Sequence, residues 1–153
     1  MGGRRRKFKK LFDGSPATQW QPEDFVIYLD ENLCNCAPLL AVLRELNVRH
    51  ERHLRHFRPG LDDDVWLPAV GSKKWVLLTT DKGFRYNQLE KRAFRRYKVR
   101  AFEFSRNNIG GEMMAAALRK AIPIMKRLAE KTSGCLLASI TKDGNVTVKW
   151  PRS

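Results

Sequence analysis

The sequence lacks the features that mark membrane, secreted and dinucleotide-binding proteins. No apolar stretch approaches the roughly 20 residues that a helix needs to span a bilayer, and the N-terminus carries charge without the apolar core of a secretory signal. No G-x-G-x-x-G follows the first apolar run, which argues against a dinucleotide-binding Rossmann domain. We therefore expect a cytoplasmic protein that does not act in a membrane.

Cysteine and histidine are also scarce, with three of each. Cys34 and Cys36 are too close for an easy disulfide, and together with Cys135 they give only weak evidence for zinc. We interpret them as reduced thiols, with the first two at the start of a helix. All three histidines lie within residues 49–58 among arginines that would repel a metal ion. We interpret that segment as an RNA-facing basic surface or a solvated edge.

Acidic residues are few for the number of basic ones. The 153 residues include 30 Lys and Arg but 16 Asp and Glu, so the net charge is +14. A hydrophobic content of 42% is that of a folded chain, and the length suits one domain with its own core. A small domain this basic is expected to bind a polyanion, with nucleic acid as the first choice and an anionic membrane surface as the second.

Part of the positive charge lies in a predicted N-terminal tail, residues 1–24. The run RRRKFKK at 4–10 contains no acid, and Asp13-Gly14-Ser15-Pro16 predicts a turn. A flexible arm on RNA or DNA phosphates and a solvated, disordered terminus explain this composition equally well. The folded domain is expected over residues 25–150.

The most informative stretch is FVIYLDENL, Phe25 to Leu33. Its five leading apolar residues form a run short enough for a fully buried strand, and the run ends abruptly in Asp30-Glu31-Asn32. The pattern returns once, as WVLLTTD at 75–81, where a second buried strand ends in Asp81. Buried strands with acids at their carboxyl ends are typical of an open parallel sheet with a site at that end of the strands.

Helical and strand patterns alternate along the rest of the chain. One strand pattern, Val48–Leu54, is polar enough to belong near an edge, and Lys142-Asp143-Gly144-Asn145 predicts a hairpin turn. The alternation predicts a three-layer α/β fold with a mainly parallel sheet, helices on both of its faces and a C-terminal antiparallel hairpin. The predicted elements are strand 25–30, helix 37–46, strand 48–54, a helix from Asp62 or Asp63, strand 75–80, helix 86–97, strand 99–104, helix 112–131 and the hairpin strands CLLASI and VTVKW.

The acids at the two strand ends can converge with a third group. Residues 61–71 read LDDDVWLPAVG, and three consecutive carboxylates exceed what helix capping needs. One acid of this triplet can point into the same crevice as Asp30 and Asp81. Clustered carboxylates repel one another unless a cation bridges them, and hard oxygen ligands suit Mg²⁺ or Mn²⁺. In a chain that attracts nucleic acid, such a site predicts metal-dependent phosphodiester hydrolysis.

A second basic region lies between Asp81 and Arg106. It contains nine basic and three acidic residues, and such an excess of one sign is unusual for a plain solvated helix face. A phosphate backbone can lie along it. The predicted RNA-binding residues are Lys82, Arg85, Arg92, Arg95, Arg96 and Arg106.

These motifs, in this order, resemble those of the PIN-like domains, and the branch most similar is that of VapC-type toxin ribonucleases and related small PIN-like proteins. The resemblance implies a PIN-like fold, an RNase activity that depends on Mg²⁺ or Mn²⁺, and a toxin that an antitoxin protein neutralises; a homodimer is common in that family. It covers about residues 25–150 and rests on YLDENL at 28–33, D-D-x-W-L-P-x-V-G at 63–71, WVLLTTDK at 75–82, F-x-F-S at 102–105 and the G-G-E-M-M helix opening.

The resemblance also implies which acids form the site. Asp30 and Asp81 match metal-binding acids of the family. Asp63 is the match within the triplet because it lies three residues before the Trp, with Asp64 as the alternate. Asp30, Asp63 and Asp81 are thus both the implied metal ligands and the implied catalytic residues.

One position departs from the family pattern. A fourth acid usually follows the next strand, where this chain reads Ser105-Arg106-Asn107-Asn108. Ser105 or Asn107 would then serve as a neutral ligand. Further support for the site is implied for Glu31 and Asn32, and phosphate binding for Lys82 and Arg85.

Two other functions stay open on the sequence. A phosphorylated receiver-like domain also has acids at strand ends and uses Mg²⁺, although Asp30-Glu31, Asp81 and Lys82 match its pattern poorly and a charge of +14 is unusual for it. A non-catalytic RNA- or DNA-binding protein on a degenerate PIN-like fold would explain the missing fourth acid.

Overall fold

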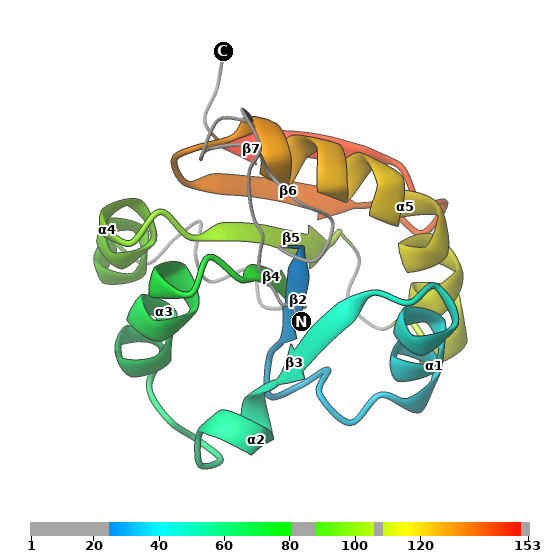
Figure 1. The fold of residues 1–153 in the computed structure, drawn as a ribbon, viewed down its shortest axis with the longest axis horizontal. Coiled ribbons are helices and arrows are strands. Elements are labelled where there is room, and N and C mark those ends of the chain that lie inside the picture. Colours follow the sequence, from blue (N-terminus) through cyan, green and yellow to red (C-terminus); the bar gives the residue numbers. More distant parts are fainter. Residues whose placement is uncertain (1–24, 81–87, 106–108, 151–153) are drawn as a thin grey trace, which may run out of the picture.

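The computed structural model describes residues 25–80, 88–105 and 109–150, and the side chains of all of these except residues 88–90. In these ranges six strands form one sheet in the order β3-β2-β4-β5-β6-β7, with helices on both sides of it (Figure 1). The elements are β2 (Val26–Leu29), α1 (Ala37–Glu45), β3 (Arg49–Arg52), α2 (His53–His56), α3 (Asp63–Ser72), β4 (Val76–Thr79), α4 (Gln88–Arg96), β5 (Arg100–Phe104), α5 (Gly111–Lys131), β6 (Leu136–Ile140) and β7 (Val146–Trp150).

The central strands are buried on both faces, and each face packs against different helices. Because side chains alternate along a strand, Ile27 and Leu29 belong to the core cluster shared with α1 and α5. Tyr28 points the other way, into the cluster shared with α3 and α4. Figure 1 shows these two helix pairs on opposite sides of the sheet. The predicted three-layer α/β fold is confirmed, since β3, β2, β4, β5 and β6 are all parallel.

The strand order creates a crevice between β2 and β4. After β2 the chain passes through α1 and returns to β3 on one side of β2, whereas β4 pairs with β2 on the other side. In open α/β sheets, ligands bind at the carboxyl ends of two neighbouring strands whose connections leave in opposite directions. Asp30 follows β2 and Thr79 ends β4, so both residues lie at this position.

Strand β3 lies at the edge of the sheet, as its polar sequence predicted. The predicted strand Val48–Leu54 is too long, because His53–His56 form the short helix α2 instead. This helix places His53 inside the protein, where its side chain is 1% exposed. The expected RNA-facing or solvated surface is therefore wrong for His53, whereas His50 is half-buried and His56 exposed.

Helices α1 and α5 approach each other closely where α5 begins. Pro38 occupies the first turn of α1, where a missing N–H costs no helical hydrogen bond. A Cβ atom at Gly111 would lie 3.2 Å from Cys36 Sγ and 3.2 Å from a Pro38 ring carbon, so the absence of a side chain permits this approach. Asn47, with a φ of 57°, provides a left-handed stop after α1.

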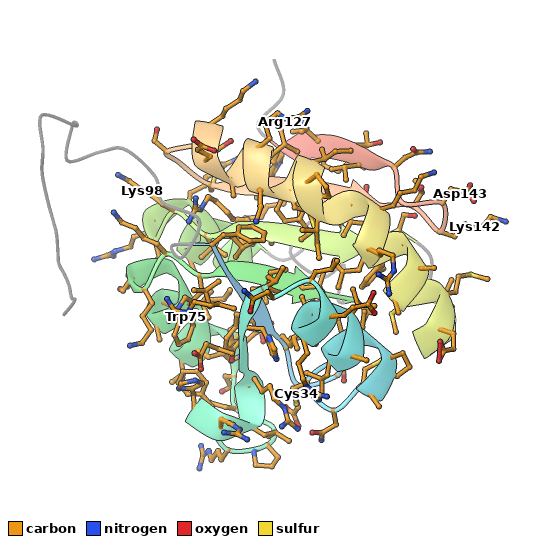
Figure 2. The ribbon with its side chains drawn as sticks, turned by 45° about the vertical axis from the view of Figure 1, so that its right-hand side comes forward. Cys34, Trp75, Lys98, Arg127, Lys142 and Asp143 are labelled. Atoms are coloured by element: carbon orange, nitrogen blue, oxygen red, sulfur yellow. The ribbon has the colours of Figure 1, made fainter. Side chains whose placement is uncertain are left out.

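The C-terminal hairpin is also confirmed, because β6 pairs in parallel with β5 and antiparallel with β7. Gly144 has a φ of 85° in the turn, a conformation that glycine adopts without steric cost. Lys142 and Asp143 lie at the tip of the hairpin (Figure 2).

Cys34, a buried free thiol, lies before α1 (Figure 2). None of the described helices is long and apolar enough to cross a membrane.

Arg100 is a buried cation in the first position of β5. Its side chain donates hydrogen bonds to the carbonyl oxygens of Ala129 at 2.6 Å and Lys74 at 2.7 Å. Ala129 lies in the last turn of α5, where carbonyl groups lack partners within the helix, and Lys74 precedes β4. Burial lowers the pKa of the guanidinium from its ordinary value. One side chain thus connects the end of α5 to the loop before β4.

Candidate active site

Asp30 is a buried carboxylate that the fold holds in place, with 5% of its surface exposed. Its Oδ1 accepts a hydrogen bond from the Leu33 N–H at 3.0 Å, and its Oδ2 accepts one from the Thr79 hydroxyl. Its backbone N–H donates to the Leu78 carbonyl at 3.4 Å, and its carbonyl accepts from Leu33 and Cys34 at 3.1 and 2.9 Å. The carboxylate therefore has a defined position at the end of β2.

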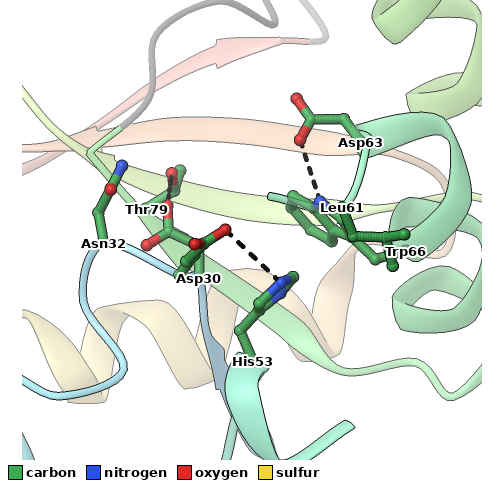
Figure 3. A pocket seen from close by; sticks show the side chains of 8 residues that line it. Asp30, Asn32, His53, Leu61, Asp63, Trp66 and Thr79 are labelled. Atoms are coloured by element: carbon green, nitrogen blue, oxygen red, sulfur yellow. Dashed lines mark hydrogen bonds and ion pairs between the residues drawn. The ribbon is translucent and has the colours of Figure 1, made fainter. Parts of the chain in front are cut away.

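A pocket of about 120 Å³ lies beside Asp30 (Figure 3). A pocket of this size can hold several water molecules, a phosphate group or a hydrated cation. Figure 3 shows Asp30 and Asp63 on opposite sides of the pocket. The lining residues are Asp30, Glu31, Asn32, His53, Leu61, Asp63, Trp66 and Thr79.

The structure brings one acid of the Asp62–Asp64 triplet into the pocket. Asp63 is half-buried in the first turn of α3, and its Oδ1 accepts a hydrogen bond from Trp66 Nε1 at 3.0 Å. Asp64 is exposed and does not line the pocket. Asp62 occupies the predicted N-cap position, but its side chain makes no capping hydrogen bond. Within the triplet, the side chain that reaches the pocket is therefore that of Asp63.

Glu31 connects the loop after β2 to the loop before α3. Its Oε1 accepts a hydrogen bond from the Gly60 N–H at 2.9 Å and lies 4.0 Å from His53 Nε2. Asn32 is exposed at the rim and completes this side of the lining. The hydrogen bond to Gly60 holds the chain that leads into Asp63 close to the chain that carries Asp30.

The oxygen donors of the pocket suit a hard divalent cation in kind. Carboxylate, amide and hydroxyl oxygens are the ligands that Mg²⁺ and Mn²⁺ prefer. Within the ranges that the structure describes, no three His, Cys, Asp or Glu side chains lie close enough together to hold a metal ion. A complete ligand set here would need a further residue, and Asp81, the third predicted ligand, lies outside those ranges.

Ser105 is a predicted support residue that the structure describes outside the pocket. It directly follows β5, where its N–H donates to the Ile140 carbonyl at 2.9 Å, and it does not line the pocket. Four further predicted residues lie outside the described ranges: Lys82, Arg85, Arg106 and Asn107.

His53 is a pocket residue that the sequence interpretation missed. Its Nδ1 lies 2.5 Å from the Tyr28 hydroxyl in the core. Aromatic rings surround the pair: Trp66 stacks on Tyr28 with the ring centres 5.7 Å apart and meets His53 edge-on at 5.7 Å, and Phe57 lies 5.5 Å from His53. The sequence did indicate that a polar group lies near Tyr28, because a tyrosine within a fully buried strand needs a polar partner for its hydroxyl.

Burial, together with the nearby negative charge of Asp30, raises the pKa of Tyr28 above its ordinary value. Below about pH 10 the phenol is protonated in both the folded and the unfolded chain. Above that pH only the unfolded chain ionises there, so the free energy of unfolding should fall as pH rises, by up to about 1.4 kcal/mol per pH unit. Tyr28→Phe should remove this contribution. Urea unfolding between pH 9 and 11 tests this, with Tyr97→Phe as the control, and an unchanged slope in Tyr28→Phe would contradict the assignment.

A row of buried polar side chains crosses the carboxyl end of the sheet. Thr79 lies opposite Glu103, and Glu103 lies opposite Ser139, all three being at most 3% exposed. The sequence interpretation treated VRAFEF as an ordinary strand and missed Glu103. The signal was a charged residue inside a strand whose neighbours on both faces are apolar, which marks a buried acid. The fold thus brings a further carboxylate to the end of the sheet where Asp30 lies.

The predicted basic face of α4 is exposed in its described part. Arg95 and Lys91 lie over the Trp150 ring, with Arg95 Cζ 5.1 Å and Lys91 Nζ 5.5 Å from its centre. Arg92 and Arg96 are also exposed. Because α4 leads into the amino end of β5, its last turn lies toward the amino ends of the strands. The pocket lies at the opposite end, where the strands finish. Binding of RNA by these arginines stays a prediction.

Comparison with known protein families shows which family this chain matches. A family model described as a PIN like domain matches residues 25–106, more than half of the chain. The matched range includes β2 to β5 and every described residue of the pocket. Comparisons with curated proteins and with solved structures give no significant match. The chain therefore belongs to the family of PIN-like domains.

Proposed function

We propose that this PIN-like domain is an endoribonuclease that depends on Mg²⁺ or Mn²⁺ and hydrolyses RNA phosphodiesters. The observation that carries the proposal is the position of Asp30, a buried carboxylate on the wall of a phosphate-sized pocket where β2 and β4 diverge. A carboxylate held at a fixed position in a pocket lined by other oxygen-bearing side chains is a suitable ligand for a hard divalent cation.

The proposed ligands are Asp30, Asp63 and Asp81, which are also the proposed catalytic residues. When bound, the cation would supply Lewis acidity toward a phosphate oxygen and a counter-charge for it. The chain itself keeps two ligands in place: Thr79 and Leu33 orient Asp30, and Trp66 orients Asp63. Supporting roles are proposed for Glu31, Asn32, Asp64, Ser105, Asn107 and Glu103.

Basic residues in the segment between His53 and Leu61, which both line the pocket, would receive the RNA backbone. Arg55 is exposed within α2, and Arg58 is exposed two residues after this helix. Arg52 has another role, because it donates to the Cys34 carbonyl at 2.7 Å and to Asn35 Oδ1 at 2.5 Å. We propose that phosphates bind at Arg55 and Arg58, and that one phosphate enters the pocket while the bases remain outside. Further contacts are proposed for Lys82, Arg85, Arg92, Arg95, Arg96 and Arg106.

A toxin role is the finer part of the proposal. The resemblance of YLDENL and WVLLTTDK to VapC-type ribonucleases supports it. An antitoxin protein and a second copy of the chain are the proposed protein partners, and cytoplasmic RNA is the proposed substrate.

Cleavage of total RNA tests the activity itself. The purified protein is expected to degrade RNA in the presence of Mn²⁺ or Mg²⁺, and cleavage is expected to stop when EDTA is added, with the products followed on a denaturing gel.

A non-catalytic RNA- or DNA-binding protein is the alternative, and the missing fourth acid after β5 favours it. Binding that persists in EDTA, with no cleavage of single-stranded or structured RNA in either metal, would establish the alternative and overturn the enzyme proposal.

A further inference from the structure

The tautomer of His53 follows from its hydrogen bond to Tyr28. A tyrosine hydroxyl is protonated at neutral pH and is a hydrogen-bond donor. The Tyr28 hydroxyl lies 2.5 Å from His53 Nδ1. If Nδ1 carried the proton, the buried hydroxyl would lose its acceptor, which costs about 1–3 kcal/mol. Nδ1 is therefore the acceptor, and the ring proton of neutral His53 is on Nε2.

The Nε2–H group has no hydrogen-bond partner among the described residues, although the atom is buried. Its nearest charged neighbour is Glu31 Oε1 at 4.0 Å, which is beyond hydrogen-bond distance. The ring lines the pocket, and Figure 3 shows it directed toward the side of the pocket that carries Asp30. A buried donor without an acceptor is rare in native proteins, so this one indicates an acceptor that a ligand brings.

We infer that His53 is a substrate-contacting residue, whose Nε2–H donates a hydrogen bond to a phosphoryl oxygen bound in the pocket. This inference rests on the proposed phosphodiester cleavage. The carboxylates and His53 would then bind different groups, since Asp30 and Asp63 favour a cation whereas the Nε2–H group favours an anionic oxygen. A fixed donor in a site shielded from water can stabilise the charge that develops on phosphate.

Glu31 controls access to this donor. Its side chain is 41% exposed, and its carboxylate is the charged group nearest to Nε2. When the Glu31 carboxylate rotates into solvent it gives up its hydrogen bond from the Gly60 N–H, and a phosphoryl oxygen can then take its place beside His53. The indole of Trp66 and the ring of Phe57 keep the imidazole from following it.

Two substitutions at position 53 separate contact with the substrate from a structural role. The amide of Gln can place an N–H near the position of Nε2, whereas the amide of Asn reaches only the position of Nδ1. His53→Asn can therefore still accept from Tyr28 but has no donor for the pocket. His53→Gln keeps a donor for the pocket but cannot accept from Tyr28. We expect kcat/KM for a fluorogenic oligoribonucleotide to fall roughly 100-fold in His53→Asn and roughly tenfold or less in His53→Gln. Thermal unfolding should rank the two variants in the opposite order.

The control is His56→Gln, which changes an exposed histidine of the same helix that pairs with Glu51 at 2.7 Å. It should keep the wild-type kcat/KM. If His53 had only a structural role, activity would follow stability, and His53→Asn would be the more active variant. That order, in a wild-type protein that cleaves RNA, would overturn this inference and leave the proposed function intact.

A second measurement applies if the wild-type protein cleaves no RNA, in which case the proposed function fails. The ¹⁵N spectrum of the histidine rings should show His53 protonated at Nε2. Addition of a phosphorothioate oligoribonucleotide with Mg²⁺ should shift the His53 Nε2 resonance and leave that of His56 in place. An unchanged His53 resonance at saturating oligonucleotide would overturn the inference by itself.

Discussion

Replacing Asp30 by Asn is expected to reduce RNA cleavage at least roughly 100-fold and to leave the protein folded. Asn has nearly the shape of Asp, and its amide oxygen can still accept from the Leu33 N–H. The Thr79 hydroxyl can rotate and accept from the new amide hydrogens instead of donating. What the variant loses is the negative charge in the pocket, and with it the attraction for a divalent cation.

Cleavage rates measured at several Mn²⁺ concentrations test this expectation, together with thermal unfolding of each variant. Asp143→Asn is the control, since Asp143 lies at the tip of the β6–β7 hairpin (Figure 2), and β4 and β5 separate β6 from β2 in the sheet. Asp63→Asn should also lose activity, because Asp63 lines the same pocket. An Asp30→Asn protein as active as wild type would show that the reaction occurs elsewhere.

Replacing Arg100 by Met is expected to lower the free energy of unfolding by about 3 kcal/mol. Met fills most of the volume but donates no hydrogen bond, so the carbonyls of Ala129 and Lys74 lose the donor that the guanidinium provides. Each carbonyl left without a partner costs about 1–3 kcal/mol when it is buried. RNA cleavage at low temperature should be nearly unchanged, because Arg100 lies at the amino end of β5, opposite the pocket.

Urea unfolding at pH 7 measures this loss, and Arg127→Met is the matched control. Arg127 is exposed on α5 (Figure 2), so the same change there should alter stability by less than about 0.5 kcal/mol. Arg100→Lys should fall between wild type and Arg100→Met, because an ammonium group cannot reach both carbonyls with the geometry of a planar guanidinium. Equal stability of Arg100→Met and wild type would mean that water replaces the lost donors.

Much of the fold could be predicted because local patterns agreed with the final packing. Buried parallel strands read as short apolar runs, so the runs before Asp30 and Thr79–Thr80 identified the central strands β2 and β4. The polar strand before α2 was correctly expected at an edge. The position of Asp63 in the pocket could also be anticipated, because an acid three residues before Trp66 lies on the same side of the helix.

Other parts of the site depend on contacts between distant segments. His53 lies in a stretch whose polar composition predicts exposure, and only the packing of α2 against Tyr28 and Trp66 places it inside. The sequence marks Glu103 as a charged residue within an apolar strand, but strand composition does not reveal which strand lies next to it. Its position beside Thr79 follows from the parallel register of β4 and β5, which no local pattern specifies.

The match to the PIN-like family ends at residue 106, just after β5, whereas the sheet continues through β6 and β7. A fragment that stopped at that boundary would keep the pocket residues but lose the neighbour of β5. The N–H and C=O groups along one side of β5 would be unpaired, and the apolar face that α5 covers would meet solvent. Exposed edges of this kind template pairing between chains. Such a fragment should therefore aggregate, and α5 with the hairpin prevents pairing between chains along β5.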